Sequence, residues 1–224
     1  MKKALALLFL APLTLAAATP NWPGFVRQAP GGAYVMGNPQ AKVKVVEYLS
    51  FTCSHCAHFV EEGGKPLKAN YIAKGQVSLE LRNAVRDQLD MTAALLSRCG
   101  GAAKVFGNSE LLFATQAEWG SKVDSFVTAQ GEKLKAMPMN AQLQAIAKGT
   151  GMTAIMARRG FTPAQLNACL ISRPAQQHIA DMTKEAWQTR KIRGTPSFLI
   201  NGTAVSGSHW PDLDSALQAA LAAR

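Results

Sequence analysis

The sequence has 224 residues, of which 48% are hydrophobic and 17% are charged, and its formal net charge is +10. This balance excludes an extended disordered chain and allows one large folded domain or two small ones. The basic residues stand singly or in pairs rather than in runs, which argues against binding of nucleic acid.

Residues 1–18 have the pattern of a signal peptide for export. Lys2 and Lys3 form a basic start, Ala4 to Leu15 form an apolar run, and Ala16 to Ala18 form a small-residue cleavage site. The apolar run is shorter than the roughly 20 residues that a membrane helix needs. We therefore expect a soluble, exported mature protein.

The first strands are expected after a lead-in that is rich in Pro and Gly. Residues 19–32 are predicted to be irregular, and residues 33–36 to form a short edge strand. Residues 43–51 are dense in strand-forming residues and contain neither Gly nor Pro, which predicts a central strand.

A helix is expected directly after this central strand. It begins around the sequence Thr52-Cys53-Ser54-His55-Cys56, continues to about residue 74, and is expected to bend at Gly63 and Gly64. Alternating apolar residues in 76–81 predict another strand. Strand, helix and strand would then form one crossover unit.

The second half of the chain is mainly helical in pattern. Residues 90–190 read as a series of helices punctuated by Gly and Pro, after which residues 197–200 and 203–206 form two strands around an Asn-Gly turn. An amphipathic helix is expected from about Pro211. The fold class is therefore α/β, with an inserted all-helical domain.

Four cysteines are present, and four cysteines allow three pairings. Spacing singles out only Cys53 and Cys56, a Cys-x-x-Cys pair at a strand-to-helix junction. Unpaired N–H groups and the helix dipole favour an anion at a helix N-terminus, so Cys53 is the expected nucleophile. His55 adds a ring N–H or a positive charge close by. Stabilising the ionised, reduced form makes the disulfide more oxidising.

A Cys-x-x-Cys pair also occurs as half of a zinc site. The other half would have to come from Cys99 and Cys169, which are far apart in the sequence, or from single histidines. Structural zinc sites usually contain a second close pair. The residues therefore favour redox chemistry with no metal and no other cofactor than the Cys53–Cys56 disulfide.

Two segments resemble the DsbA family of periplasmic dithiol oxidases. They are residues 46–59, which contain Cys-Ser-His-Cys, and residues 194–202, which contain Thr195-Pro196. The resemblance extends over nearly all of the mature chain and implies a thioredoxin fold with a helical insert and a periplasmic location. It implies a thioredoxin-like domain in two parts, residues 33–89 and 191–224, with a helical domain at residues 90–190 between them.

The resemblance also implies roles for single residues. Pro196 corresponds to a cis-proline that faces the cysteine pair, and Thr195 would give backbone hydrogen bonds to an extended substrate segment. Glu47 corresponds to a buried acid under the cysteines, which could move protons to or from Cys56. The alternative for Glu47 is a solvent-facing strand residue.

Cys99 and Cys169 resemble the extra cysteine pair of some alphaproteobacterial members, which implies a structural disulfide; the alternative is two buried thiols. Ser54 stands where the best-known oxidases have Pro, and a Thr at the position of Thr195 also occurs in isomerases and reductases. The oxidising strength is therefore left open. Phe113, Gln116 and Trp119 are expected to pack between helices, although an exposed Trp119 would contact substrate.

The expected function is the introduction of disulfides into exported proteins. The expected partners are reduced or unfolded exported proteins and a membrane quinone reductase of the DsbB type, and the protein is expected to be a monomer. The nearest alternative is a disulfide isomerase or reductase. An alternative of another class is a protein that holds unfolded chains, or binds metal through Cys53 and Cys56, without redox turnover.

Overall fold

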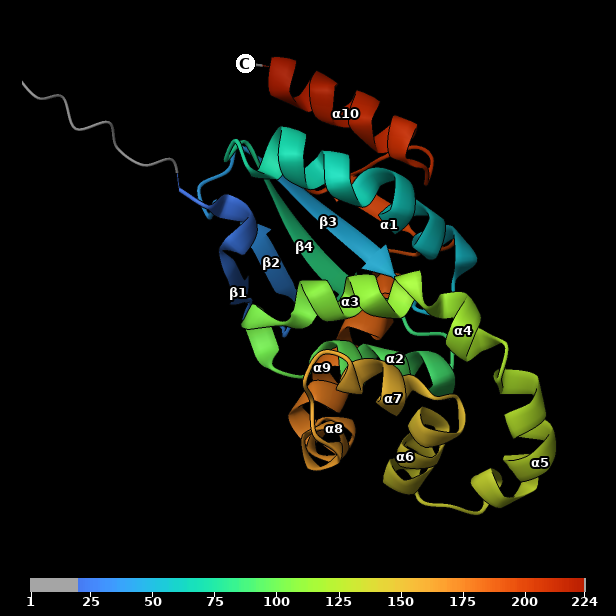
Figure 1. Ribbon diagram of the computed structural model, residues 1–224. Coiled ribbons are helices and arrows are strands. Elements are labelled where there is room, and N and C mark those ends of the chain that lie inside the picture. Colours follow the sequence, from blue (N-terminus) through green and yellow to red (C-terminus); the bar gives the residue numbers. More distant parts are fainter. Residues whose placement is uncertain (1–19, 224) are drawn as a thin grey trace, which may run out of the picture.

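The computed structural model describes residues 20–223, and the predicted signal peptide, residues 1–18, lies outside this range. Its centre is a six-stranded mixed sheet with the strand order β1-β2-β4-β3-β5-β6 (Figure 1). The strands are β1 (Val26–Gln28), β2 (Tyr34–Gly37), β3 (Val43–Leu49), β4 (Val77–Asn83), β5 (Ser197–Ile200) and β6 (Thr203–Ala204).

Two groups of helices surround the sheet. Helices α1 and α10 lie side by side against it, and the helices between β4 and β5 gather mainly beyond one end of it (Figure 1). The α-helices are α1 (Ser54–Leu67), α2 (Gln88–Ser97), α3 (Val105–Ala114), α4 (Gln116–Gly120), α5 (Val123–Lys135), α6 (Met139–Gly149), α7 (Met152–Ala157), α8 (Pro163–Leu170), α9 (Arg173–Lys184) and α10 (Trp210–Ala222).

Strand β3 lies inside the sheet, parallel to β4 and antiparallel to β5. Successive side chains of a strand point to opposite faces, so Val45 and Glu47 share one face and Val46 and Tyr48 the other. Val45 packs in a core with residues of α1, α3 and α10, whereas Tyr48 packs with Ala186, directly after α9. The central strand is thus covered on both faces.

Helix α1 begins where β3 ends and turns an apolar stripe inward. Its buried residues Cys56, Phe59, Gly63 and Leu67 recur every three or four positions, which places them on one helix face. The helix continues through Gly63 and Gly64, where a bend was predicted. The regular α-helix ends just after Pro66, which lacks an N–H to donate, and a π-helical turn follows at 68–72.

Two predictions about the first strands were wrong. The lead-in, residues 19–32, was predicted to be irregular but contains strand β1. This segment is too short to show a strand pattern, and it forms a strand because its backbone pairs with β2. The strand predicted for residues 33–36 is not at an edge, because β2 lies between β1 and β4.

The predicted fold class, α/β with an inserted all-helical domain, is confirmed. The helical series joins the end of β4 to the start of β5, so the sheet is built from two distant parts of the chain. None of the helices in residues 20–223 combines the length and apolar character that crossing a bilayer requires.

Candidate active site

Cys53 occupies the N-cap position of α1, directly after the central strand. Its carbonyl oxygen accepts the first helical hydrogen bond, from the N–H of Ala57, at 3.3 Å. The sulfur therefore lies at the end of the helix where unpaired N–H groups and the dipole favour negative charge. The thiol is buried, with 6% of the residue exposed.

The two sulfurs differ strongly in their acidity. The pKa of Cys53 is lowered to about 4, mainly by a hydrogen bond from the Cys56 thiol. Burial opposes this shift, whereas hydrogen bonds from the N–H groups of Cys56 and His55 lower the pKa further. Burial is the largest cause that raises the pKa of the Cys56 thiol, and the hydrogen bond with Cys53 raises it further. At neutral pH the reduced pair therefore holds a thiolate at Cys53 and a thiol at Cys56.

The loop before β5 faces the Cys53 sulfur. The thiol of Cys53, when protonated, donates to the carbonyl oxygen of Thr195 across 3.0 Å. The Thr195–Pro196 peptide bond is cis. A groove of about 770 Å³ runs along this loop, and its lining includes His55, Thr195, Pro196 and His209. The structure thus places the Cys53 sulfur against the proline loop, and His55 and that loop line the same groove.

Glu47 lies on the face of β3 that α1 covers. Only 3% of the residue is exposed, and its Oε1 atom has no hydrogen-bond partner within residues 20–223. Burial raises the pKa of this carboxyl to about 8. A negative charge on Glu47 contributes to the raised pKa of Cys56. Glu47 is therefore a buried acid that interacts electrostatically with the inner cysteine, and not a solvent-facing residue.

Gln116 has a part in the site that the sequence did not indicate. Its side-chain amide donates to the carbonyl oxygens of Phe51 at 2.7 Å and of Cys53 at 3.0 Å. Gln116 belongs to the helical insert, so the insert fixes the turn that carries the nucleophile. The packing predicted for this region holds for Phe113, whose ring stacks on Phe51 with centroids 4.7 Å apart.

Asp90 is a second residue that sequence reasoning missed. It is fully buried, and its carboxylate accepts hydrogen bonds from the Ser50 hydroxyl at 2.6 Å and from the N–H of Phe51 at 2.7 Å. Burial raises its pKa to about 6. Its only sequence signal is its position in the first turn of α2, where an acid is ordinary. The carboxylate holds the chain just before Cys53.

The other predicted residues lie in the helical insert. Cys99, directly after α2, and Cys169, in α8, form a disulfide with their Cα atoms 5.7 Å apart. Trp119 is 2% exposed, and its ring N–H donates to the carbonyl oxygen of Leu112 at 2.9 Å. Trp119 is therefore a packing residue and not a substrate contact.

The path of the chain around Cys53 defines the class of protein. A strand, a helix that begins with the cysteine pair, a parallel strand, and a proline loop leading into an antiparallel hairpin form the thioredoxin fold, here with helices inserted before the hairpin. Residues 30–221 match the family model described as Thioredoxin, and the chain belongs to that family.

Two curated relatives, from Rickettsia typhi and Rickettsia bellii, carry the name protein-disulfide oxidoreductase and are 27% identical over 188 and 187 residues. These matches cover 84% of this chain in both cases and 61% and 64% of the relatives. The chain thus spans about three fifths of the length of these proteins.

Solved structures show the same fold. A protein-disulfide isomerase from Novosphingobium aromaticivorans superposes with a TM-score of 0.79 at 33% identity, over 85% of this chain and 98% of that one. The alpha-DsbA1 protein of Wolbachia pipientis superposes with a TM-score of 0.66 at 20% identity, over 84% and 89%.

Proposed function

We propose that this protein is a periplasmic thiol:disulfide oxidoreductase that introduces disulfides into reduced exported proteins through Cys53 and Cys56. The observation that carries the proposal is the lowered pKa of Cys53, about 4, at the start of α1. A thiolate stabilised in the reduced protein favours reduction of the pair, so its disulfide is a strong oxidant of other thiols.

The transfer takes two exchange steps. A substrate thiolate attacks the Cys53 sulfur of the Cys53–Cys56 disulfide, so a mixed disulfide forms and Cys56 leaves with the electron pair and takes up a proton. The second substrate thiolate then attacks the substrate sulfur of the mixed disulfide and releases Cys53 as a thiolate. The substrate loses two electrons and the cysteine pair gains them.

The groove beside Pro196 is the proposed binding site for the substrate. An extended segment of a reduced protein lies along the loop and pairs with the backbone of Thr195, as in strand addition. The Cys53 sulfur borders this loop, 3.0 Å from the Thr195 carbonyl oxygen. A substrate cysteine in the groove is therefore close to the sulfur that it attacks.

Glu47 gives the proton that Cys56 needs when it leaves. Its carboxyl pKa of about 8 means that it carries a proton at neutral pH, and the negative charge left after it releases that proton raises the pKa of Cys56. A membrane quinone reductase of the DsbB type reoxidises the pair. The protein acts as a monomer.

A disulfide isomerase is the second candidate function, because the Novosphingobium structure that is 33% identical is named as one. An isomerase works in its reduced form: Cys53 attacks a wrong disulfide, and the substrate's own thiols resolve the mixed disulfide. The two functions use the same sulfur and differ in the redox state that the protein holds at work.

The deciding experiment mixes the oxidised protein with a reduced peptide that contains two cysteines. We expect the peptide to gain a disulfide and the protein two thiols, and we expect Cys53→Ser to abolish this transfer while peptide binding persists. Peptide oxidation by the Cys53→Ser variant would contradict the proposal.

Of two further measurements, the first tests the oxidising strength of the pair and the second separates the oxidase from the isomerase. Equilibration with glutathione should leave the pair mostly reduced, and a pair that stays oxidised would exclude an oxidase. The second measurement compares two rates: the rearrangement of a protein with scrambled disulfides by the reduced form, and the oxidation of the peptide by the oxidised form. A higher rate of rearrangement would favour the isomerase.

A further inference from the structure

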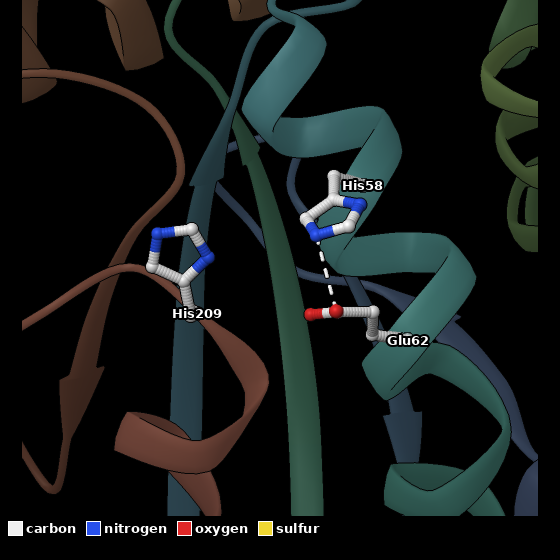
Figure 2. Close-up of side chains that lie close together, drawn as sticks. All are labelled: His58, Glu62 and His209. Carbon is white, nitrogen blue, oxygen red and sulfur yellow. Dashed lines mark ion pairs between the residues drawn. The ribbon is translucent and has the colours of Figure 1, made fainter.

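Two side chains on the exposed face of α1 lie one helical turn apart and meet at their tips. The Nε2 atom of His58 is 3.0 Å from the Oε1 atom of Glu62, and the side chains are 52% and 41% exposed. His209, just before α10, extends toward them from a distant part of the chain (Figure 2). One ligand atom from each of the three residues lies within 4.8 Å of the others.

The packing of α10 on α1 places His209 in this group. Gly63 lies against Trp210, and a Cβ atom at Gly63 would approach the Trp210 ring to 2.8 Å. The carboxylate of Asp212 accepts from the N–H groups of Ser208 and His209, at 3.1 and 3.0 Å. The backbone of His209 is therefore fixed, and its side chain is exposed.

An ion pair between His58 and Glu62 does not account for all three residues. A surface pair at this helical spacing contributes only about 0.3–0.5 kcal/mol, and it needs no third partner. His209 nevertheless presents its ring edge-on to that of His58, with the centroids 6.2 Å apart. Two imidazoles and one carboxylate that converge on one point are a set of ligands for a transition-metal ion.

We propose that His58, Glu62 and His209 bind one Zn²⁺ ion. Zinc takes histidine nitrogen and carboxylate oxygen at about 2.0–2.2 Å, so neighbouring tetrahedral ligand atoms lie roughly 3.3 Å apart. The His58–Glu62 pair is already close to that separation. A rotation of the exposed His209 side chain closes the remaining distance and leaves a fourth position for water.

The site borders the groove beside the cysteine pair. His209 lines that groove together with His55 and Pro196, and the rings of His55 and His209 lie 6.4 Å apart. A bound ion therefore adds positive charge and an open coordination position at the edge of the groove. Neither Cys53 nor Cys56 contributes a ligand, so zinc binding and thiol exchange can be tested separately.

The test uses the protein with Cys53 and Cys56 oxidised, because free thiols also bind zinc. Titration with zinc chloride in a calorimeter should show one equivalent bound. Glu62→Gln and His209→Ala should each weaken binding at least about tenfold, since each removes a ligand. The control is Glu61→Gln, a neighbouring exposed acid on α1, which should bind as the unaltered protein does.

A second measurement guards against an effect of the substitutions on structure. Zinc should shift the ring NMR signals of His58 and His209 together and leave those of His178, in the helical insert, unchanged. The proposal is overturned if millimolar zinc does not bind to the oxidised protein. It is equally overturned if Glu62→Gln and His209→Ala bind zinc as tightly as Glu61→Gln does.

Discussion

The side-chain amide of Gln116 donates a 3.0 Å hydrogen bond to the backbone carbonyl oxygen of Cys53. The same amide group donates to the carbonyl oxygen of Phe51. A residue of the helical insert thereby spans the turn between the central strand and the active-site helix. The insert is part of the machinery that positions the nucleophile, in addition to covering the sheet.

Replacing Gln116 should loosen this turn. Gln116→Met keeps the length of the side chain but leaves two carbonyl oxygens without their donor, which should lower the free energy of unfolding by roughly 1–3 kcal/mol. The pH dependence of Cys53 alkylation should also change, because the position of the sulfur at the start of α1 is less well fixed. Denaturant unfolding and alkylation kinetics measure the two effects.

Gln177→Met is a suitable control for this variant, because Gln177 is exposed and its side-chain amide donates to the Asp181 carboxylate within the same helix, α9. We expect its stability to stay within about 0.5 kcal/mol of the unaltered protein. A Gln116→Met variant with the stability and alkylation profile of this control would show that the two hydrogen bonds do not position Cys53.

The central part of the site could be predicted from the sequence because its residues are close together in the chain. A strand without Gly or Pro, followed at once by Cys53 and Cys56, determines both the junction and the nucleophile. Gln116 and Asp90 could not be found in this way, since their partners lie far from them in the chain and, apart from the Ser50 hydroxyl, are backbone groups, which carry no sequence signal. His58 and His209 come together only through the packing of α10 on α1, which neither segment reveals in its own sequence.

Strand β1 shows a related limit. Its three residues form a strand only because β2 supplies hydrogen-bond partners, and pairing between segments is not visible in either segment alone. Glu47 illustrates the opposite case: the family resemblance implied a buried acid at this position, and the carboxyl is buried.

The thiolate of Cys53 should be detectable by titration of the reduced protein. Ultraviolet absorbance of the thiolate, or the rate of alkylation, should show a midpoint near pH 4. The largest cause of the low pKa is the hydrogen bond from Cys56, so Cys56→Ala should raise the midpoint. A midpoint that stays near pH 4 in Cys56→Ala would assign the low pKa to the helix N-terminus instead.

The same ionisation makes the stability of the reduced protein depend on pH. The pKa of Cys53 falls from 9.0 to about 4 on folding, so the unfolded chain binds more protons between these values. Stability of the reduced form relative to the oxidised form should therefore rise from pH 4 to pH 9 and be lost as pH falls through 4. Unfolding of both forms across this range measures the difference, and parallel curves would contradict it.

Glu47 should have the opposite dependence. Its pKa rises from 4.5 to about 8 on folding, so between these values the folded state keeps a proton that the unfolded state has lost, and stability falls as pH rises. Glu47→Gln should remove this fall and exceed the unaltered protein in stability at pH 9, by an amount on the order of a few kcal/mol. Glu61→Gln, at an exposed acid, serves as the control.

The proton transfer proposed for Glu47 has a kinetic test. Gln cannot release a proton, so reduction of the oxidised Glu47→Gln protein by dithiothreitol should be slower near pH 7, where Glu47 is protonated in the unaltered protein. The difference should shrink above pH 8. Equal reduction rates at pH 7 would remove Glu47 from the exchange and leave it a buried acid without that role.

The Cys99–Cys169 disulfide should stabilise the protein without taking part in thiol exchange. The two cysteines are 70 positions apart, and closing a loop of this length restricts the unfolded chain by about 4 kcal/mol in the chain-entropy model. Cys99→Ala with Cys169→Ala should lower the free energy of unfolding by about that amount and leave peptide oxidation within about twofold, because neither residue lines the groove beside Pro196. A Cys53→Ser, Cys56→Ser variant isolates this bond: reduction should add the mass of two hydrogen atoms, and a variant that already carries two free thiols would contradict the disulfide.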